Sequence, residues 1–327
     1  MAAKHKQYTF ISFIESDLLF KPREGVTFKT RDEIPLLQVK YSVFVTALRK
    51  LVQDWLDGKV GIGQPSEQWE KDAIAEVNKA VNDADGFADD ADDVNNVSDD
   101  LINRVYNEMV KIKVPGHLKV VTSHRKWLRL SFGFLEKIGA KVSDKMPRLI
   151  RVHDLSKYTH REVLGYAVMF GDGSVDWRKL ETEAEKIEWD NTLYNHYAGN
   201  PHHPEYFYPL KDDGNRDKSV PMLKLDTTNG QDYVDESLID MLAARGERIL
   251  ANDKTFNVKK WMDIPDRYMF RYAEEDKQYV IKCYDHYKEL AKQFLSIESN
   301  AAEMKGFFDF IGIPDRSVVY EDYEEGK

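Results

Sequence analysis

Histidine and aspartate side chains gather in the middle of the sequence in an order that suits a metal site. His153 and Asp154 are adjacent in the segment HDLSKYTHREV, and three more histidines, His196, His202 and His203, follow in YNHYAGNPHHPEYF. Imidazole nitrogens and carboxylate oxygens together suit zinc, manganese and iron. These residues therefore predict a site for one or two divalent ions.

Two further ligands are expected outside these segments. His124 lies on the apolar stripe of a helix predicted over residues 116–139, and Asp240 lies in a helix predicted over residues 235–252. Helices of a bundle can direct such side chains into a shared core. A histidine on an apolar stripe can also serve packing alone, and Asp240 lies opposite the apolar stripe of its own helix. Both residues are included in the predicted set because the other candidate ligands are present in the same sequence.

The histidine-rich segment follows the end of a predicted helix. Gly199 and Pro201 end that helix, so His196 falls on its last turn, and His202 and His203 lie on a loop between two prolines. Either loop histidine could bind an ion beside His196. We favour His203, which lies seven residues after His196, and keep His202 as the alternative.

The segment after Asp154 has two interpretations. Thr159 and Glu162 have the spacing of a capping box, so the His-Asp pair could simply precede a capped helix. Within this segment Lys157 could stabilise negative charge near the ions, or it could be a solvated loop lysine. His160 follows the predicted cap, is expected to be exposed, and is left out of the site.

The elements that position these residues are predicted to be helices. Apolar residues at helical spacing predict helices over residues 39–56, 66–81, 116–139, 159–171, 177–199, 235–252 and 279–312. Ser66 is the expected N-cap of the second helix. Strands and helices do not alternate, so an all-α fold is predicted. Short extended pieces are expected only in the first forty or so residues.

One acidic segment divides the chain. Residues 82–100 contain eight aspartates and neither lysine nor arginine. The spacing does not match a calcium loop of the EF-hand type, so a solvated linker is predicted. We therefore expect an N-terminal extension over residues 1–100, mixed and then helical, a metal-binding helical domain over residues 101–297, and a C-terminal tail over residues 298–327.

Composition restricts the partners and the location. The net charge of −10 argues against general binding to nucleic acid, which needs clustered lysine and arginine. No apolar stretch is long enough to span a bilayer, and the N-terminus lacks a signal-peptide pattern. The single cysteine, Cys283, agrees with a reducing compartment. A cytoplasmic protein that acts on a small molecule, without membrane partners, is predicted; an oligomer is possible.

The order of the ligands resembles the HD-domain superfamily of helical, metal-dependent phosphohydrolases. The segments His-Asp-x-Ser-Lys and His-x-x-x-Asn-x-His-His-x-Glu-Tyr are similar to an uncharacterised branch of it, and the resemblance covers roughly residues 117–251. It implies an HD-like helical bundle in which a first ion is held by His124, His153, Asp154 and Asp240. A second ion would be held by His196 with His203 or His202, and Asp154 would bridge the two.

The resemblance also implies a reaction. A phosphohydrolase would use water activated by one or two divalent ions (Mn, Fe, Zn, Co or Mg) to cleave a phosphomonoester or a nucleotide. Asp154 would be the bridge or proton acceptor, and Lys157 would face the phosphate. Two alternatives stay open: an HD-type di-iron oxygenase acting on a small molecule, and a helical protein whose histidines bind a structural metal or none.

Overall fold

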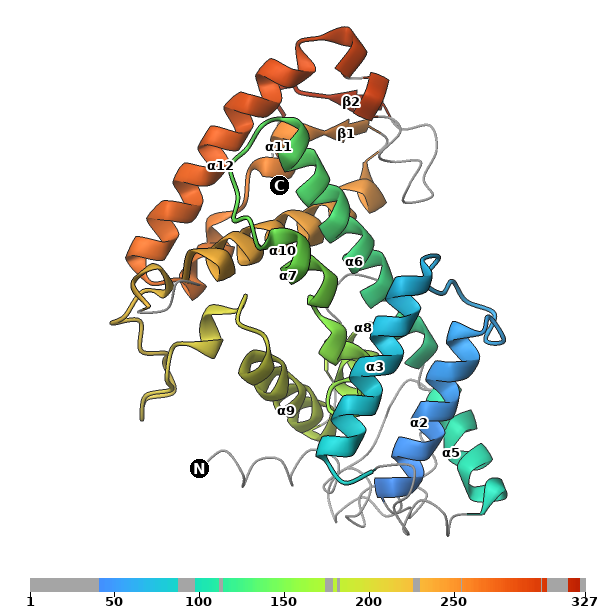
Figure 1. Cartoon of the computed structure of the whole chain (residues 1–327). Coiled ribbons are helices and arrows are strands. Elements are labelled where there is room, and N and C mark those ends of the chain that lie inside the picture. Colours follow the sequence, from blue (N-terminus) through green and yellow to red (C-terminus); the bar gives the residue numbers. More distant parts are fainter. Residues whose placement is uncertain are drawn as a thin grey trace. The chain divides into compact units, whose positions relative to one another are not determined.

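The computed structural model describes residues 41–87, 98–111, 114–173, 179–180, 183–225, 230–253, 255–300, 302–304 and 317–323. They form two compact units (Figure 1). The first comes from residues up to 122 and from 154–199, and the second from 123–153 and from 200 onwards. The chain therefore passes between the units within one helix, between His153 and Asp154, and between Gly199 and Asn200.

The first unit is helical. Its elements are α2 (Tyr41–Leu56), α3 (Gln68–Ala84), α5 (Asp99–Lys111), the first part of α6 (Val114–Lys137), the 3-10 helix η2 (Leu155–Tyr158), α8 (Val163–Phe170) and α9 (Glu183–Gly199). Helix α2 packs beside α5, and α8 packs beside α9. The core contains Leu51 and Trp55 of α2, and the Trp55 ring stacks on Tyr158 of η2 with 5.8 Å between ring centroids.

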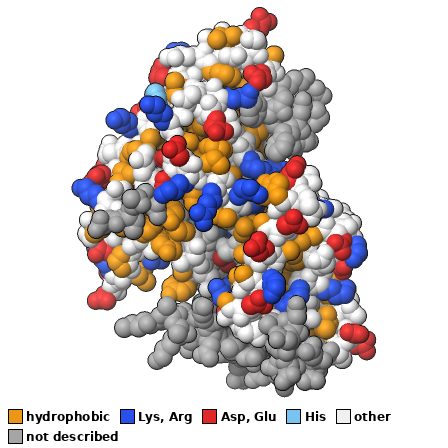
Figure 2. Space-filling model, viewed as in Figure 1, with side chains coloured by type: hydrophobic (Ala, Val, Ile, Leu, Met, Phe, Trp, Pro, Cys, Tyr) orange, Lys and Arg blue, Asp and Glu red, His pale blue; other side chains and the backbone are white. Residues whose placement is uncertain are grey.

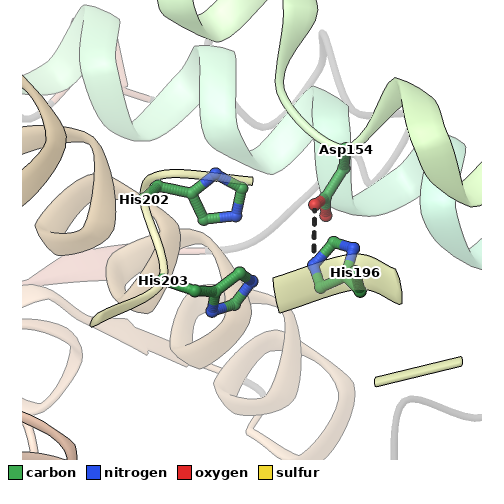
Figure 3. Close-up of side chains that lie close together, drawn as sticks. All are labelled: Asp154, His196, His202 and His203. Carbon is green, nitrogen blue, oxygen red and sulfur yellow. Dashed lines mark ion pairs between the residues drawn. The ribbon is translucent and has the colours of Figure 1, made fainter. Parts of the chain in front are cut away.

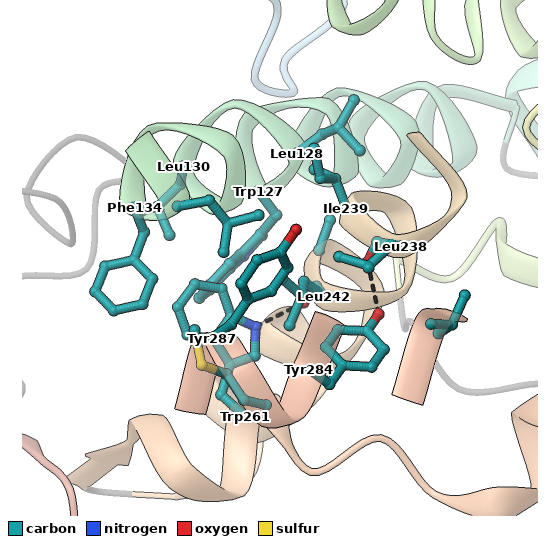
Figure 4. Close-up of a cluster of buried hydrophobic side chains, with 14 of the residues drawn as sticks. Trp127, Leu128, Leu130, Phe134, Leu238, Ile239, Leu242, Trp261, Tyr284 and Tyr287 are labelled. Atoms are coloured by element: carbon teal, nitrogen blue, oxygen red, sulfur yellow. Dashed lines mark hydrogen bonds between the residues drawn. The ribbon is translucent and has the colours of Figure 1, made fainter. Parts of the chain in front are cut away.

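The second unit contains the rest of α6 and the elements that follow. These are α7 (Met146–Val152), η3 (Pro204–Tyr206), η4 (Met222–Lys224), α10 (Gly230–Asn252), β1 (Thr255–Asn257), α11 (Val258–Met262), η5 (Asp266–Arg271), α12 (Glu274–Leu295) and β2 (Ser317–Val319). The apolar faces of α6, α10 and α12 meet in one core (Figure 4). Two of its aromatic side chains have paired polar atoms: Trp261 Nε1 donates to the Leu242 carbonyl and Tyr284 Oη to the Leu238 carbonyl, each at 2.7 Å.

A glycine lets aromatic rings approach α10 closely. A Cβ atom at Gly246 would lie 2.6 Å from the Trp127 ring and 2.9 Å from Trp261 Nε1. Any larger residue would displace one of these fully buried rings, which pack against each other at 6.4 Å. The helix that carries Asp240 is thereby fixed against α6, which carries His124.

The predicted all-α class is confirmed. The strands β1 and β2 pair in parallel over three residues each, from Thr255 opposite Ser317 to Asn257 opposite Val319, and they leave the helical class unchanged. Within the described residues, no helix is both long and apolar enough to cross a membrane. On the face drawn in Figure 2, basic and acidic side chains are interspersed rather than sorted by sign.

Two predicted helix caps are wrong. Helix α3 begins at Gln68 with Glu67 as N-cap and without a side-chain cap, so Ser66 does not cap it. Helix α8 begins at Val163, and its N-cap Glu162 makes no capping hydrogen bond. Thr159 Oγ1 instead donates to the Ser156 carbonyl at 2.7 Å. At Thr159 the hydroxyl thus binds a nearby carbonyl group instead of capping the helix.

The expectation that His160 is exposed is also wrong. Its ring is buried between α3 and the start of α8, with Nδ1 3.0 Å from Asn82 Oδ1 and Nε2 3.0 Å from Asp85 Oδ2. Arg161 binds the same Asp85 carboxylate through two nitrogens. Helix α3 ends at Ala84, so its last residues and the C-cap Asp85 belong to the acidic segment. The extended pieces predicted before residue 41 and most of the acidic linker, residues 88–97, lie outside the described residues.

Candidate metal centre

Three side chains of the second unit converge on one point. His124 comes from α6, His153 from the residue that ends α7, and Asp240 from α10. Asp240 Oδ1 lies 2.9 Å from His124 Nε2 and 3.6 Å from His153 Nε2. One ligand atom from each residue lies within 4.8 Å of the others. Helix α6, the C-cap of α7 and the much later helix α10 thus present two imidazoles and one carboxylate to a common position.

These separations fit a coordinated ion. Two ligand atoms about 2.1 Å from a metal lie about 3.0 to 3.4 Å apart at octahedral or tetrahedral angles. The two measured distances to Asp240 Oδ1, 2.9 and 3.6 Å, lie close to that interval. Small movements of these side chains would place all three atoms around one ion. The group is therefore compatible with metal binding.

Glu236 contacts the ring nitrogen of His153 that faces away from Asp240. It lies one turn before Asp240 on α10, so both carboxylates share one face of the helix. Its Oε1 atom lies 2.9 Å from His153 Nδ1. A carboxylate can only accept, so Nδ1 of His153 donates, and in the neutral ring Nε2 keeps a lone pair on the side of Asp240. This arrangement, a carboxylate on the far nitrogen of a ligating histidine, is common at metal sites.

Both carboxylates of the centre are held ionised. Burial would raise the pKa of Glu236, but His202 and His153 outweigh it and lower the pKa to about 2. Burial would likewise raise the pKa of Asp240, but hydrogen bonds from His124 and His153 hold it well below its ordinary value. The histidines stabilise these carboxylates while their rings are protonated. When the rings lose these protons to act as metal ligands, the two carboxylates leave a local excess of negative charge. A divalent cation would balance that excess.

A buried arginine fixes the backbone at His153. The Arg125 side chain is fully buried, and its guanidinium donates through Nη1 to the His153 carbonyl and through Nη2 to the Arg151 carbonyl at 3.0 Å. Arg125 follows His124 directly on α6. His124 is therefore a candidate ligand, and the next residue, Arg125, holds the backbone of a second candidate ligand, His153.

The two loop histidines lie in the same unit and have different partners. His202 Nδ1 is 3.4 Å from Glu236 Oε1, and its ring lies 4.0 Å from that of His153. His202, His153 and Glu236 form a second group with ligand atoms close enough to share an ion. His203 lies 4.3 Å from His202 between ring centroids, and its Nδ1 is 2.7 Å from Arg271 Nη2. Both rings are buried.

Asp154 and His196 form a pair in the first unit (Figure 3). Asp154 Oδ1 is 3.4 Å from His196 Nε2, and His196 Nδ1 is 2.9 Å from Glu162 Oε2. All three side chains are buried. Asp154 has a left-handed backbone, with φ 58° and ψ 14°, which is costly for a residue other than glycine. The strained turn directs this carboxylate toward the last turn of α9.

Lys157 is held beside the same carboxylate. Its Nζ atom lies 2.5 Å from Asp154 Oδ2 and 4.8 Å from the centroid of the Tyr166 ring. Its carbonyl is 3.0 Å from His117 Nε2, and burial lowers the pKa of His117 to about 4, so this ring is neutral and donates. The lysine therefore sits in a fixed position rather than on a freely moving loop.

The structure thus divides the predicted site residues between the two units. His124, His153, Asp240, His202 and His203 lie in the second unit, and Asp154, Lys157 and His196 lie in the first. The bridging role of Asp154 and the second ion stay predictions. Sequence reasoning missed two carboxylates. Glu236 could have been found from its spacing of four residues to Asp240, whereas Glu162 was assigned to a cap.

Glu188, on α9, gives the first unit a testable pH dependence. Burial raises the pKa of this carboxyl to about 8, whereas an unfolded glutamate titrates near about 4.3. The folded state therefore holds the proton more tightly, so stability is full below the unfolded value and falls as the pH rises toward the folded one. We expect Glu188→Gln to remove this loss, at about 1.4 kcal/mol for each pH unit between the two values.

Urea unfolding at pH 4 and at pH 8 checks this expectation. The variant should match the wild type at pH 4 and exceed it at pH 8, whereas Glu76→Gln, at an exposed position of α3, should change neither. Equal gains at both pH values would show that the carboxyl of Glu188 is not the cause.

Comparisons with known proteins give a family but no relative of established activity. The model of a family of unknown function, DUF5662, matches residues 102–297. A search of curated proteins and a search of solved structures each found no match. The matched range contains every residue of the centre described above.

Proposed function

The chain belongs to the DUF5662 family, and we propose that it is a divalent-metal-dependent phosphohydrolase acting on a small phosphorylated molecule. One observation carries the proposal: His124, His153 and Asp240 converge within 4.8 Å, with Glu236 on the far nitrogen of His153. Such a group, with a carboxylate that orients one ligand, is what a catalytic metal needs. The reaction class is proposed because the order of the ligands in the sequence resembles that of metal-dependent phosphohydrolases.

The donor set restricts the ion. Two imidazole nitrogens and a carboxylate oxygen, without thiolate, favour zinc, manganese, iron or cobalt. Such an ion would neutralise charge on phosphoryl oxygens and would lower the pKa of a water molecule toward neutral pH. A small set of protein ligands would leave room for substrate and water at such an ion.

The residues of the second unit have distinct parts in this proposal. His124, His153 and Asp240 hold the ion, Glu236 fixes the tautomer of His153, and Arg125 fixes its backbone. We assign His202 rather than His203 to the ligand set, because Glu236 makes Nδ1 of His202 the donor and leaves its Nε2 lone pair for a metal. This reverses the preference drawn from sequence spacing.

Addition of single metals to chelator-treated protein tests the reaction class. We expect phosphate release from p-nitrophenyl phosphate or from nucleotides with at least one of Mn, Zn, Co and Fe(II), and none without metal. Oxygen consumption by the iron-loaded protein with a small organic substrate, without phosphate release under any metal, would identify an oxygenase and overturn the proposal.

The role of Glu236 leads to a separate prediction. Glu236→Gln keeps the side-chain shape but removes the charge that supports His153, so metal affinity should fall by about tenfold to a hundredfold. Phosphatase activity at saturating metal should largely return. Isothermal titration with Zn²⁺ measures the affinity, and Glu289→Gln, at an exposed position of α12, is the matched control. Unchanged affinity in the Glu236 variant would remove Glu236 from the centre.

A further inference from the structure

His203 differs from the other site histidines in the partner of its Nδ1 atom. The partner is Arg271, whose Nη2 atom lies 2.7 Å away. A guanidinium stays protonated and has only donors, so Nδ1 of His203 must accept. In the neutral ring the hydrogen is then on Nε2. Nε2 of His203 is therefore a donor, which is the opposite of what a metal ligand needs.

The arginine that sets this tautomer is itself fixed. Arg271 ends η5, and its Nε and Nη2 atoms donate to the two carboxylate oxygens of Glu205 at 2.8 and 2.6 Å. Glu205 lies two residues after His203, in η3, and His203 is the extended N-cap of that short helix. A bidentate arginine–carboxylate pair holds its geometry well. Glu205 thus holds Arg271 in place, and Arg271 in turn holds the His203 ring.

The neighbouring histidine has the opposite arrangement. His202 has the Glu236 carboxylate at its Nδ1, and its ring lies 4.3 Å from that of His203. Consecutive residues thus present a lone pair at one Nε2 and an N–H at the other. At a centre that binds a cation, an N–H donor beside the ligands complements the negative oxygens of a substrate.

We propose that His203 is a hydrogen-bond donor to an anionic group of the substrate, and that Arg271 and Glu205 are its positioning residues. The inference rests on the proposed function, in which the anionic group is the phosphoryl group. His203 is then excluded from the metal ligands. Its loss should weaken phosphate binding and leave the metal content unchanged.

Two substitutions separate a donor from a ligand. The side-chain nitrogen of glutamine can take the place of Nε2, whereas that of asparagine reaches only about as far as Nδ1. In the zinc-loaded protein, His203→Gln should keep its affinity for inorganic phosphate within about threefold, and His203→Asn should lose about tenfold to a hundredfold. Both variants should keep the zinc content of the wild type, as should His286→Gln at an exposed position of α12.

Loss of zinc from both His203 variants would make His203 a ligand and overturn the inference. Equal phosphate affinity in both, with zinc retained, would also overturn it, because the donor would then not reach the anion. A wild-type chain that takes up no zinc defeats the proposed function instead. In that case the tautomer of His203, measured without metal, still tests whether its Nε2 atom is a hydrogen-bond donor.

Nuclear magnetic resonance reads that tautomer in the metal-free protein. With ¹⁵N-labelled histidine, the couplings between ring nitrogens and carbon-bound protons distinguish the two forms, and His203→Gln assigns the signal. We expect the Nε2–H form in the wild type and a mixture in Arg271→Lys, which cannot reproduce the bidentate pair with Glu205. An Nδ1–H form in the wild type would contradict the proposed role.

Discussion

Asp240→Asn is expected to lower the affinity for a divalent ion by about a hundredfold or more, which exceeds the effect of losing an orienting carboxylate. Asp240 is the shared partner of His124 and His153, and its carboxylate carries the charge nearest to both Nε2 atoms. Asparagine has the same shape and can still accept a hydrogen bond. The fold should therefore persist while the charged ligand is lost.

Titration of the chelator-treated protein with Zn²⁺ or Mn²⁺, together with circular dichroism, measures the two effects. The matched control is Asp266→Asn, at an exposed position where η5 begins, and it should bind as the wild type does. If Asp240→Asn bound the ion as tightly as the wild type, the centre would have to be built on other residues.

Arg125→Leu is expected to destabilise the protein by about 2 to 4 kcal/mol, because one buried and one partly buried carbonyl group lose a charged donor. The carbonyls belong to Arg151 and His153 at the end of α7. Leucine fills part of the space but cannot donate. Since His153 would then lose its fixed position, metal affinity should fall as well.

Urea unfolding of the metal-free protein measures this loss without any contribution from bound metal. Arg148→Leu provides the control, because Arg148 lies on the exposed side of α7. It should change the free energy of unfolding by less than about 0.5 kcal/mol. Equal small effects of the two substitutions would show that the guanidinium of Arg125 does not hold the His153 backbone.

The helical class and several helix positions could be predicted because they depend on local periodicity. Helices α5 and α7 were not predicted, and α12 ends at Leu295 although a helix was predicted as far as residue 312. The helix predicted over residues 116–139 is observed as α6, and that over residues 235–252 forms most of α10. Tertiary partners could not be predicted in the same way. Glu162 has the spacing of a cap residue, yet its carboxylate contacts His196, 34 residues away. His160 is buried against residues of α3, which the local pattern does not reveal.

Asp240 illustrates why an apolar stripe was a poor guide at the site. Helix α10 is buried over much of its surface: Leu238, Ile239 and Ala243 are inaccessible, and the polar Glu236 is buried too. A helix enclosed in this way has no single solvent face against which a stripe can be read. Asp240 lies opposite the stripe, yet that side of α10 faces His124 and His153 rather than water.

The choice between the two loop histidines also needed the structure. Spacing from His196 favoured His203, but spacing does not specify what faces Nδ1. A carboxylate faces that atom in His202 and a guanidinium faces it in His203. The chemistry of an imidazole is set by such partners, which come from α10 and η5, far away in the sequence.

Elemental analysis of the purified chain tests the central claim most directly. After loading with Mn, Fe(II) or Zn and removal of unbound ions, the wild type should retain at least one ion per chain, and His153→Ala should retain none at the centre formed with His124 and Asp240. A wild type without bound metal, or a variant with the same metal content as the wild type, would contradict the account.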